Sequence, residues 1–441
     1  MTASGVIAVA AAAVDITPDH AAPLAGFGRR VDWTRIDSPI EMNAVGFRDA
    51  SGRRAVVVSA DLLFVGPTLE AALVERAVAR GLRRSDIFVA ATHTHFAPSV
   101  DPTKSMLGRP SDAYIDFVAA RGGRLIDEVT RDFAACHARR GGGGSRAGIN
   151  RRRDWPLPYL RRHFALKPDG AGGWRLVGPS IRPTFGTAAM APNQAGPSDP
   201  AITVWLLTDA AGAVVGVVWH FTCHPTGAPD PDAVTAEFPG IVRAALRARF
   251  GAGLPVVFLQ GFAGDVRPRV PDRDAGVVHA FRRLVVGPKF AEFDRAGWER
   301  WAGALSDDVM RAVDDARSRA AAALSGTIAS AAFDVELTAL APAAEAGRVV
   351  PFRRLRIGDA LDLVGVGAEP LQGLAPMVSS AGITPVGYVG DAFGYWPPDS
   401  ERPRGGYEVD GFMPLFGLPG RLAPGLDRVF RDAVGRLAAP D

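Results

Sequence analysis

Short apolar runs alternate with amphipathic helical segments in the first third of the chain, and this alternation constrains the fold most. Residues 54–61 and 86–95 are typical of buried strands, and residues 68–81 between them predict a helix that ends at a glycine. A further helix is expected over residues 111–140, followed by a flexible glycine connector at 141–144. The strand–helix–strand order favours an α/β fold in which part of the sheet is parallel.

The middle of the chain has a different character. Residues 151–200 are rich in Arg, Pro and Gly, which indicates long ordered loops over a site. Residues 202–208 and 213–220 predict a β-hairpin. A helix with Pro239 in its first turn and another buried strand at 255–260 follow.

Helical periodicity returns at residues 298–324, and strand pairs are expected at 327–338 and 352–366. No internal repeat and no disordered linker is evident from the sequence. We therefore predict a single catalytic domain over residues 1–441, with a mixed β-sheet core flanked by helices.

Composition excludes several classes of protein. Apolar residues make up 47% and charged residues 22% of the 441 residues, which is typical of a globular chain. The net charge is only +3 and the basic residues are scattered, so nucleic-acid binding is not indicated. No window holds ~18 consecutive apolar residues, so no membrane span is predicted. Residues 5–14 lack the basic flank of an export signal, which favours the cytoplasm.

Histidines cluster in two short windows. His93 and His95 close the strand predicted at 86–95, and residues two apart in a strand point to the same face. His220 and His224 lie at the end of another buried strand, so these two windows hold four of the eight histidines. Neutral imidazole is the commonest metal ligand, and the pattern predicts a metal or catalytic site.

Asp265 lies in a glycine-rich loop that directly follows a buried strand, where backbone N–H groups can approach a ligand or an oxyanion. Cys223 is expected to be a small buried apolar residue, and the alternative is a thiolate ligand or nucleophile. The chain lacks the G-x-S-x-G, H-E-x-x-H and C-x-x-C motifs. Histidine-based metal chemistry is therefore the leading hypothesis.

Eight short motifs occur in an order that resembles a known family. They are Val14-Asp-Ile-Thr-Pro18, Leu24-Ala-Gly-Phe-Gly28, Ser59-Ala-Asp61, Ala91-Thr-His-Thr-His95, Ile149-Asn-Arg151, His224-Pro-Thr226, Gly264-Asp265 and Gly405-Gly-Tyr-Glu-Val409. Together they resemble the N-terminal catalytic domain of the neutral/alkaline (non-lysosomal) ceramidases, over nearly the whole chain. The resemblance implies a zinc amidase that cleaves the N-acyl bond of a lipid amide.

The same resemblance implies roles for individual residues. One zinc ion per chain would be held by His93, His224, Glu369 and Tyr395. His95 would take a proton from the attacking water and deliver it to the leaving amine, and Arg151 would hydrogen-bond the substrate. Asp61 and Asp265 are candidates for orienting the ligand histidines. The spacing also permits a second metal, held by His95, His220 and either Asp61 or Asp265.

Departures from the family pattern bear on the substrate. Arg267 occupies the position where ceramidases carry a serine, and Phe96 replaces the usual serine after the second histidine. An arginine at that position can pair with a substrate carboxylate or phosphate. The chain is also expected to lack the family's C-terminal immunoglobulin-like domain. The predicted substrate is a small N-acyl compound or cyclic amide, smaller or more anionic than ceramide.

Other functions remain open at this stage. The same metal site suits an esterase, a lactonase or an amide-forming cyclase, and a non-catalytic metal- or ligand-binding protein is a further alternative. A cysteine hydrolase would use Cys223 with His220 or His95. The sequence does not predict the oligomeric state.

Overall fold

The computed structural model describes residues 5–28, 31–154, 188–270 and 290–437. It also describes the backbone of four short strands in the region expected to form long loops: β9 (Leu160–Arg161), β10 (Ala165–Pro168), β11 (Trp174–Val177) and β12 (Arg182–Pro183). Much of that predicted loop region lies outside the described residues. Among the described helices, none combines the length and the apolar character that crossing a membrane requires.

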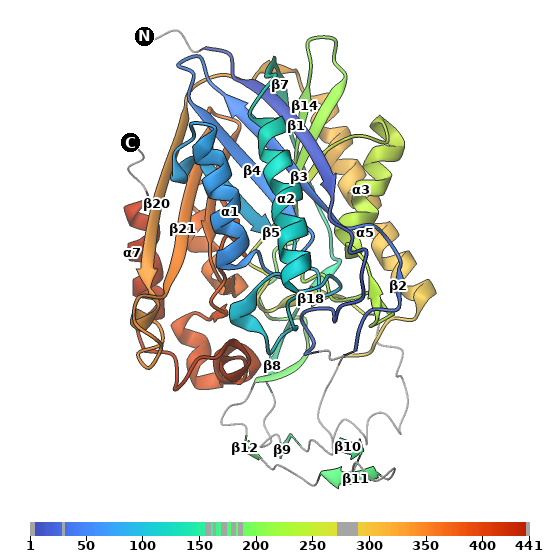
Figure 1. Ribbon diagram of the computed structural model, residues 1–441, viewed down its shortest axis with the longest axis vertical. Helices are drawn as coiled ribbons and strands as arrows, with labels where there is room; N and C mark the ends of the chain where they lie inside the picture. The colour runs from blue at the N-terminus through green and yellow to red at the C-terminus, as the bar shows by residue number, and fades with distance from the viewer. Residues whose placement is uncertain are drawn as a thin grey trace.

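The first sheet has the strand order β5-β4-β3-β1-β6, with β4 and β5 parallel and the other neighbours antiparallel. Helices α1 and α2 cover one face of this sheet (Figure 1). The elements are β1 (Ala8–Asp15), β3 (Glu41–Arg48), β4 (Arg54–Ala60), β5 (Ile87–Ala91), β6 (Ala134–Ala135), α1 (Gly66–Ala79) and α2 (Asp112–Val129).

The second sheet has the order β17-β15-β14-β7-β19, and the predicted hairpin forms its β14–β15 pair. Strands β15 and β17 are parallel, and α3 and α5 pack on the outer face. The elements are β7 (His137–Gly144), β14 (Ala201–Thr208), β15 (Val214–Phe221), β17 (Val256–Gln260), β19 (Ala322–Ala323), α3 (Glu237–Phe250) and α5 (Arg295–Ser318).

The helix expected over residues 111–140 ends early, and the expected glycine connector is a strand. Helix α2 stops at Val129, and β7 runs through the glycines and pairs with β14. A Cβ at Gly141 would lie 2.1 Å from the Ala312 carbonyl oxygen of α5. The glycines therefore allow α5 to pack directly on the strand backbone, and they do not mark a flexible link.

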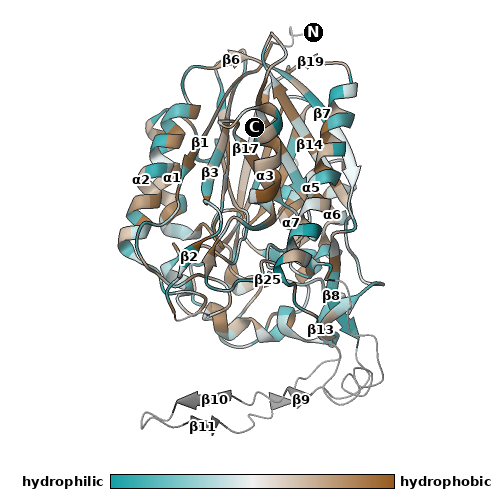
Figure 2. Cartoon of the chain, turned by 90° about the vertical axis from the view of Figure 1, so that its right-hand side faces the viewer, coloured by the Kyte–Doolittle hydropathy of each residue, from teal (hydrophilic) through white to brown (hydrophobic). Residues whose placement is uncertain are grey.

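A third sheet, β20-β21-β22-β24, packs beside the other two. Alternate strand residues face opposite layers: Val57, Val218 and Leu363 share one core between the sheets, whereas Val58 faces α1 and α2, and Trp219 faces α3 and α5. The sheets therefore lie between two outer helical layers (Figure 2), which confirms the predicted α/β fold with mixed sheets. The strands are β20 (Ile328–Glu336), β21 (Val349–Ile357), β22 (Leu361–Val366) and β24 (Thr384–Val386), followed by α7 (Leu426–Arg436).

The described chain also contains short strands and helical turns, of which β2, β8 and β18 lie at the lower end of the sheets in Figure 1. The strands are β2 (Arg35–Ile36), β8 (Gly148–Asp154), β13 (Ala188–Asn193), β16 (Ala233–Val234), β18 (Val266–Pro268), β23 (Glu369–Pro370) and β25 (Tyr395–Trp396). The short helical turns are α6 (Pro376–Ser379), η1 (Arg84–Asp86), η2 (Pro102–Lys104), η3 (Leu337–Ala339), η4 (Gln372–Leu374), η5 (Asp399–Arg404), η6 (Tyr407–Gly411) and η7 (Met413–Phe416).

The loops that follow β5 and β15 meet at this end. His95 N donates to the Pro225 carbonyl (3.4 Å), and His224 N donates to the Val266 carbonyl of β18 (3.0 Å). Two histidine-bearing loops from different sheets are thus joined by backbone hydrogen bonds.

Candidate metal centre

His93 does not lie in a strand, because β5 ends at Ala91. Its backbone takes the left-handed conformation (φ 67°), which few non-glycine residues adopt and which is common at functional sites. Its Nδ1 lies 2.9 Å from the Leu63 carbonyl oxygen, and its ring stacks on Tyr388 with 4.1 Å between centres. Since a carbonyl only accepts hydrogen bonds, Nδ1 carries a proton, and Nε2 is the ring atom left to bind a metal.

His224 is fixed in the same way. It follows β15, is fully buried, and its Nδ1 lies 2.6 Å from the Ala263 carbonyl oxygen. Burial lowers the pKa of His224 to about 4, with a further contribution from the positive charge of Arg151. The ring is therefore neutral near pH 7, with its Nε2 lone pair directed away from Ala263.

Glu369 completes a triangle of electron-pair donors. Its Oε2 lies 3.2 Å from Nε2 of both histidines, and the two Nε2 atoms are 3.1 Å apart. Glu369 is 2% exposed, and Oε2 has no hydrogen-bond donor among the described residues. Burial alone would raise the pKa of Glu369, but its interactions with His93 and His224 hold it well below its usual range. The group stays ionised, so a carboxylate oxygen and two imidazole nitrogens meet at one point.

This donor set fits a metal ion. Imidazole nitrogen and carboxylate oxygen are ordinary zinc ligands, and atoms ~2.0–2.1 Å from a tetrahedral zinc lie about 3.3 Å from one another. The observed separations of 3.1–3.2 Å match that spacing. A cation at the centre of the triangle would also remove the repulsion between the lone pairs.

His95 lies next to the triangle. Its Nε2 is 3.2 Å from Nε2 of His93, and the ligand atoms of His93, His95 and His224 all lie within 4.8 Å of one another. The ring packs against Phe27, with 4.7 Å between centres. The two histidines predicted to converge do so, but through a turn after the strand and not through the alternation of strand residues.

Tyr395 and Arg151 flank Glu369. Strand β23 pairs with β25 so that Glu369 is opposite Tyr395, whose hydroxyl accepts a hydrogen bond from Arg151 Nη2 (3.0 Å). Arg151 Nε donates to Glu408 Oε1 (2.7 Å), and Arg152 Nη1 donates to the other oxygen of the same carboxylate (2.7 Å). Burial, together with the nearby Glu369, raises the pKa of Tyr395 well above its usual value.

Asp61 and Asp265 do not orient the ligand histidines, because backbone carbonyls of Leu63 and Ala263 do so. Asp61 instead accepts from Arg243 Nη2 (2.8 Å). Asp265 accepts from the side chain of Asn150 and from the backbone of Gln372, both at 2.8 Å. These two carboxylates therefore hold the loops around the site in place and do not touch the imidazoles.

His220 points away from the centre, and its Nε2 donates to the Pro385 carbonyl (2.9 Å). It is absent from the histidine group that lies within ligand distance in the described ranges, so the structure offers no second metal site built on it. Cys223 is fully buried, and burial raises its thiol pKa well above the usual value. A thiolate nucleophile at this position is not favoured.

Arg267 lies in β18, the strand whose backbone accepts from His224 N. Its guanidinium carbon is 4.3 Å from the centre of the Phe290 ring.

Several site residues were missed from the sequence. Tyr388 stacks on His93 in a left-handed backbone conformation (φ 60°), and Glu408 joins two buried arginines. Phe64 packs on the His93 ring at 5.1 Å. Tyr388 could have been noticed in the sequence from its flanking glycines, Gly387 and Gly390. Glycines allow backbone conformations that other residues rarely adopt, and such conformations are common in tight turns. An isolated glutamate such as Glu408 gives no such signal.

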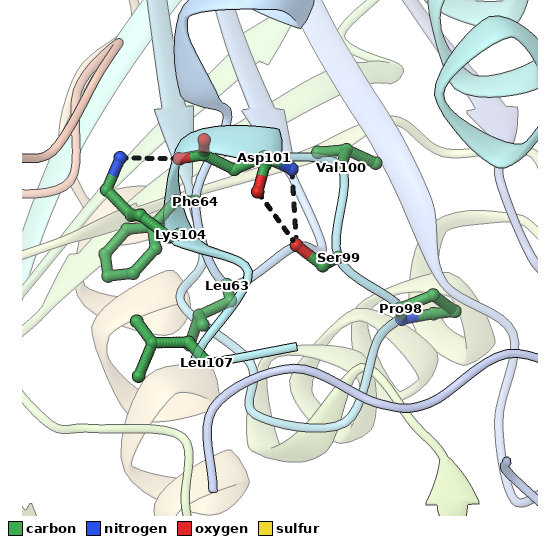
Figure 3. Close-up of a pocket in the computed structure, with 8 residues that line it drawn as sticks. All are labelled: Leu63, Phe64, Pro98, Ser99, Val100, Asp101, Lys104 and Leu107. Atoms are coloured by element: carbon green, nitrogen blue, oxygen red, sulfur yellow. Dashed lines mark hydrogen bonds and ion pairs between the residues drawn. The ribbon is translucent and has the colours of Figure 1, made fainter. Parts of the chain in front are cut away.

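A buried ion pair supports the backbone behind His93. Lys104 is 2% exposed and donates to Asp101 Oδ2 (2.5 Å). Lys104 and Asp101 line a cavity of about 10 Å³ with Leu63 and Phe64 (Figure 3). Leu63 and Phe64 both contact His93, and the cavity holds about one water molecule at most.

The fold and the site together define an α/β protein with a buried imidazole–carboxylate centre. Two solved structures share the fold, each at 17% sequence identity. The neutral ceramidase from Pseudomonas aeruginosa aligns with a TM-score of 0.71 over 99% of this chain and 75% of its own. A ceramidase complexed with C2 aligns with a TM-score of 0.70 over 97% of this chain and 74% of its own. Neither a protein-family model nor a curated protein matches the chain. The chain therefore has a neutral ceramidase-like fold.

Proposed function

We propose that the protein is a zinc-dependent hydrolase that cleaves an amide bond. The observation that carries the proposal is the triangle of His93 Nε2, His224 Nε2 and Glu369 Oε2, with sides of 3.1–3.2 Å. The fold shared with two ceramidases supports the choice of an amide over other bonds. The substrate would be a small amide, smaller or more anionic than ceramide.

The proposed ligands are His93, His224 and Glu369, with Tyr395 as the fourth. Tyr395 is the residue opposite Glu369 in the β23–β25 pair, which supports its place in the set. When bound, zinc lowers the pKa of a water to about 7 and polarises an acyl carbonyl.

His95 is proposed as the general base and acid. It lies outside the triangle with its ligand atom within 4.8 Å of those of His93 and His224, which is close enough to take a proton from a water beside them. The same distance suits a metal ligand, and the His95→Ala variant below separates the two roles. The same nitrogen would then deliver the proton to the leaving amine, because an amine leaves only when it is protonated.

Arg151 is proposed to hydrogen-bond the substrate. Glu408 and the Tyr395 hydroxyl engage its Nε and Nη2, and Nη1 makes no hydrogen bond to a described residue. Hydrogen bonds at two nitrogens fix the orientation of the guanidinium, so the N–H groups of the third nitrogen point in a fixed direction. Donors fixed in this way before the reaction stabilise negative charge that develops on the substrate.

The test is an assay of purified protein against short-chain ceramide, N-acyl amino acids, simple esters and lactones. Chelation should abolish amide cleavage, and added zinc should restore it. Full activity in metal-free protein would contradict the proposal, as would cleavage of the esters or lactones alone. Loss of zinc from His95→Ala would assign His95 as a ligand and would contradict its role as the base.

A further inference from the structure

Arg267 differs from the other buried arginines of the described chain. Arg151, Arg152 and Arg243 each form ion pairs with a carboxylate at 2.7–2.8 Å. Arg267 forms none with any described residue, and its Nε is buried without an acceptor. Among the described residues, its guanidinium lies over the Phe290 ring. A mostly buried guanidinium therefore has N–H donors that the described protein leaves unused.

The strand register places this guanidinium on the same side of the sheet as Arg151. Arg267 is directly opposite Ile149 in the β18–β8 pair, and Arg151 is two residues further along β8. Opposite residues share a face, and so do residues two apart in one strand. The preceding residue of β18, Val266, accepts the backbone N–H of His224. Arg267 thus lies at the edge of the proposed metal site.

The electrostatics agree with this placement. Burial lowers the pKa of Arg267 to about 10, and the charge of Arg151 adds to the effect. The group still carries its proton near pH 7. The nearby Glu237 forms no ion pair with Arg267. Its carboxylate accepts instead from the backbone N–H groups of Gly227, Ala228 and Phe238.

We infer that Arg267 binds a carboxylate of the substrate, so that the preferred substrates are amides bearing a single carboxylate, of which N-acyl amino acids are the simplest. This inference rests on the proposed amidase function. A carboxylate has two coplanar oxygens that match the guanidinium fork. A phosphate dianion fits less well, because Glu408 and Glu401 already compensate Arg151 and Arg152, which leaves one unpaired positive charge in the described site.

The test compares kcat/KM for N-dodecanoylglycine, its methyl ester and the monoamide of a dicarboxylic acid, in wild type and in Arg267→Gln. We expect wild type to prefer a carboxylate substrate, and Arg267→Gln to lose about 10–100-fold on it while the methyl ester changes little. Preference for the monoamide would place the carboxylate on the acyl side. Arg267→Lys should recover part of the loss, since an ammonium supplies charge without the fork. Equal loss on the acid and the ester would overturn the inference.

Arg269→Gln is the matched control. Arg269 directly follows β18, two residues after Arg267, and its Nε donates to the Arg146 carbonyl, so its loss should leave the preference unchanged. Calorimetric binding of N-(dodecylsulfonyl)glycine, which keeps the carboxylate but has no amide to cleave, separates this inference from the proposed function. Arg267-dependent binding without any amide turnover would contradict the hydrolase only. Equal binding to wild type and Arg267→Gln would contradict the role of Arg267.

Discussion

On one side of the site, electron-pair donors lack a positively charged partner; on the other side, N–H donors lack an acceptor. Around His93, His224 and Glu369, three electron-pair donors meet within 3.2 Å, and Glu369 Oε2 has no proton donor among the described residues. On β18, Arg267 presents N–H groups that no described acceptor uses. Under the proposals made above, the first region binds a cation and the second binds an anion.

The neighbouring Arg151–Glu408–Arg152 network shows what a completed arrangement looks like. Both oxygens of Glu408 receive a guanidinium N–H at 2.7 Å, and Arg152 Nε also donates to Glu401 (2.8 Å). Two guanidinium groups and two carboxylates are thus balanced within the protein. Buried charges that the chain itself leaves unbalanced are candidates for ligand binding, whereas balanced ones maintain the structure.

The largest effect is expected from Glu369→Gln. Zinc affinity should fall, and amide turnover should drop about 10³–10⁴-fold, because a metal contributes several kcal/mol to charge stabilisation. The new amide N–H can donate to a histidine Nε2, so metal-free Glu369→Gln should melt no lower than metal-free wild type. A clearly lower melting temperature of that variant would show that the lone pairs of His93, His224 and Glu369 do not repel one another in metal-free wild type.

His95→Ala should lower turnover about 10²–10³-fold at unchanged zinc content. The expected reason is loss of the proton acceptor beside an intact triangle. Metal content and kcat measured on the same preparation check this, and unchanged kcat would remove His95 from the mechanism.

Glu408→Gln should destabilise the protein by about 3–5 kcal/mol, because it leaves the buried Arg151 without a carboxylate and Arg152 with Glu401 alone. Arg267→Gln should change stability by less than about 1 kcal/mol, since no ion pair is lost. Urea unfolding of the two variants compares them directly. A similar loss in both would mean that Arg267 is compensated within the chain.

The smallest effect concerns pH. Burial raises the pKa of Glu237 to about 7, against an ordinary value of 4.5. The folded state then holds a proton that the unfolded state has released, so this contribution to stability falls by about 1.4 kcal/mol per unit as pH rises from 4.5 to 7. Unfolding at pH 5 and pH 8 should show a smaller difference in Glu237→Gln than in wild type. An identical difference would assign the slope to other groups.

Much of the fold was predictable from local pattern. The apolar runs that became β4, β14, β15 and β17 were identified, because buried strands require continuous apolar residues. The prediction of a flexible connector at residues 141–144 was wrong because it depends on a tertiary contact. Gly141 lacks a side chain where α5 packs on β7, and the local sequence gives no indication of that contact.

The site, like the fold, could be predicted only in part from the sequence. His93, His95 and His224 were predicted from their clustering, and Glu369 from the family resemblance. Their convergence depends on a left-handed turn at His93 and on hydrogen bonds to Leu63 and Ala263, which no spacing rule predicts. The misassigned roles of Asp61 and Asp265 have the same origin, because a partner distant in sequence decides where a carboxylate bonds.

Metal stoichiometry of the purified chain tests the central claim most directly. Elemental analysis of wild type and His93→Ala, each dialysed against the same limiting zinc, should give about one zinc per wild-type chain and almost none in the variant. Folded wild-type protein that binds no zinc, or equal zinc in both proteins, would contradict the metal centre.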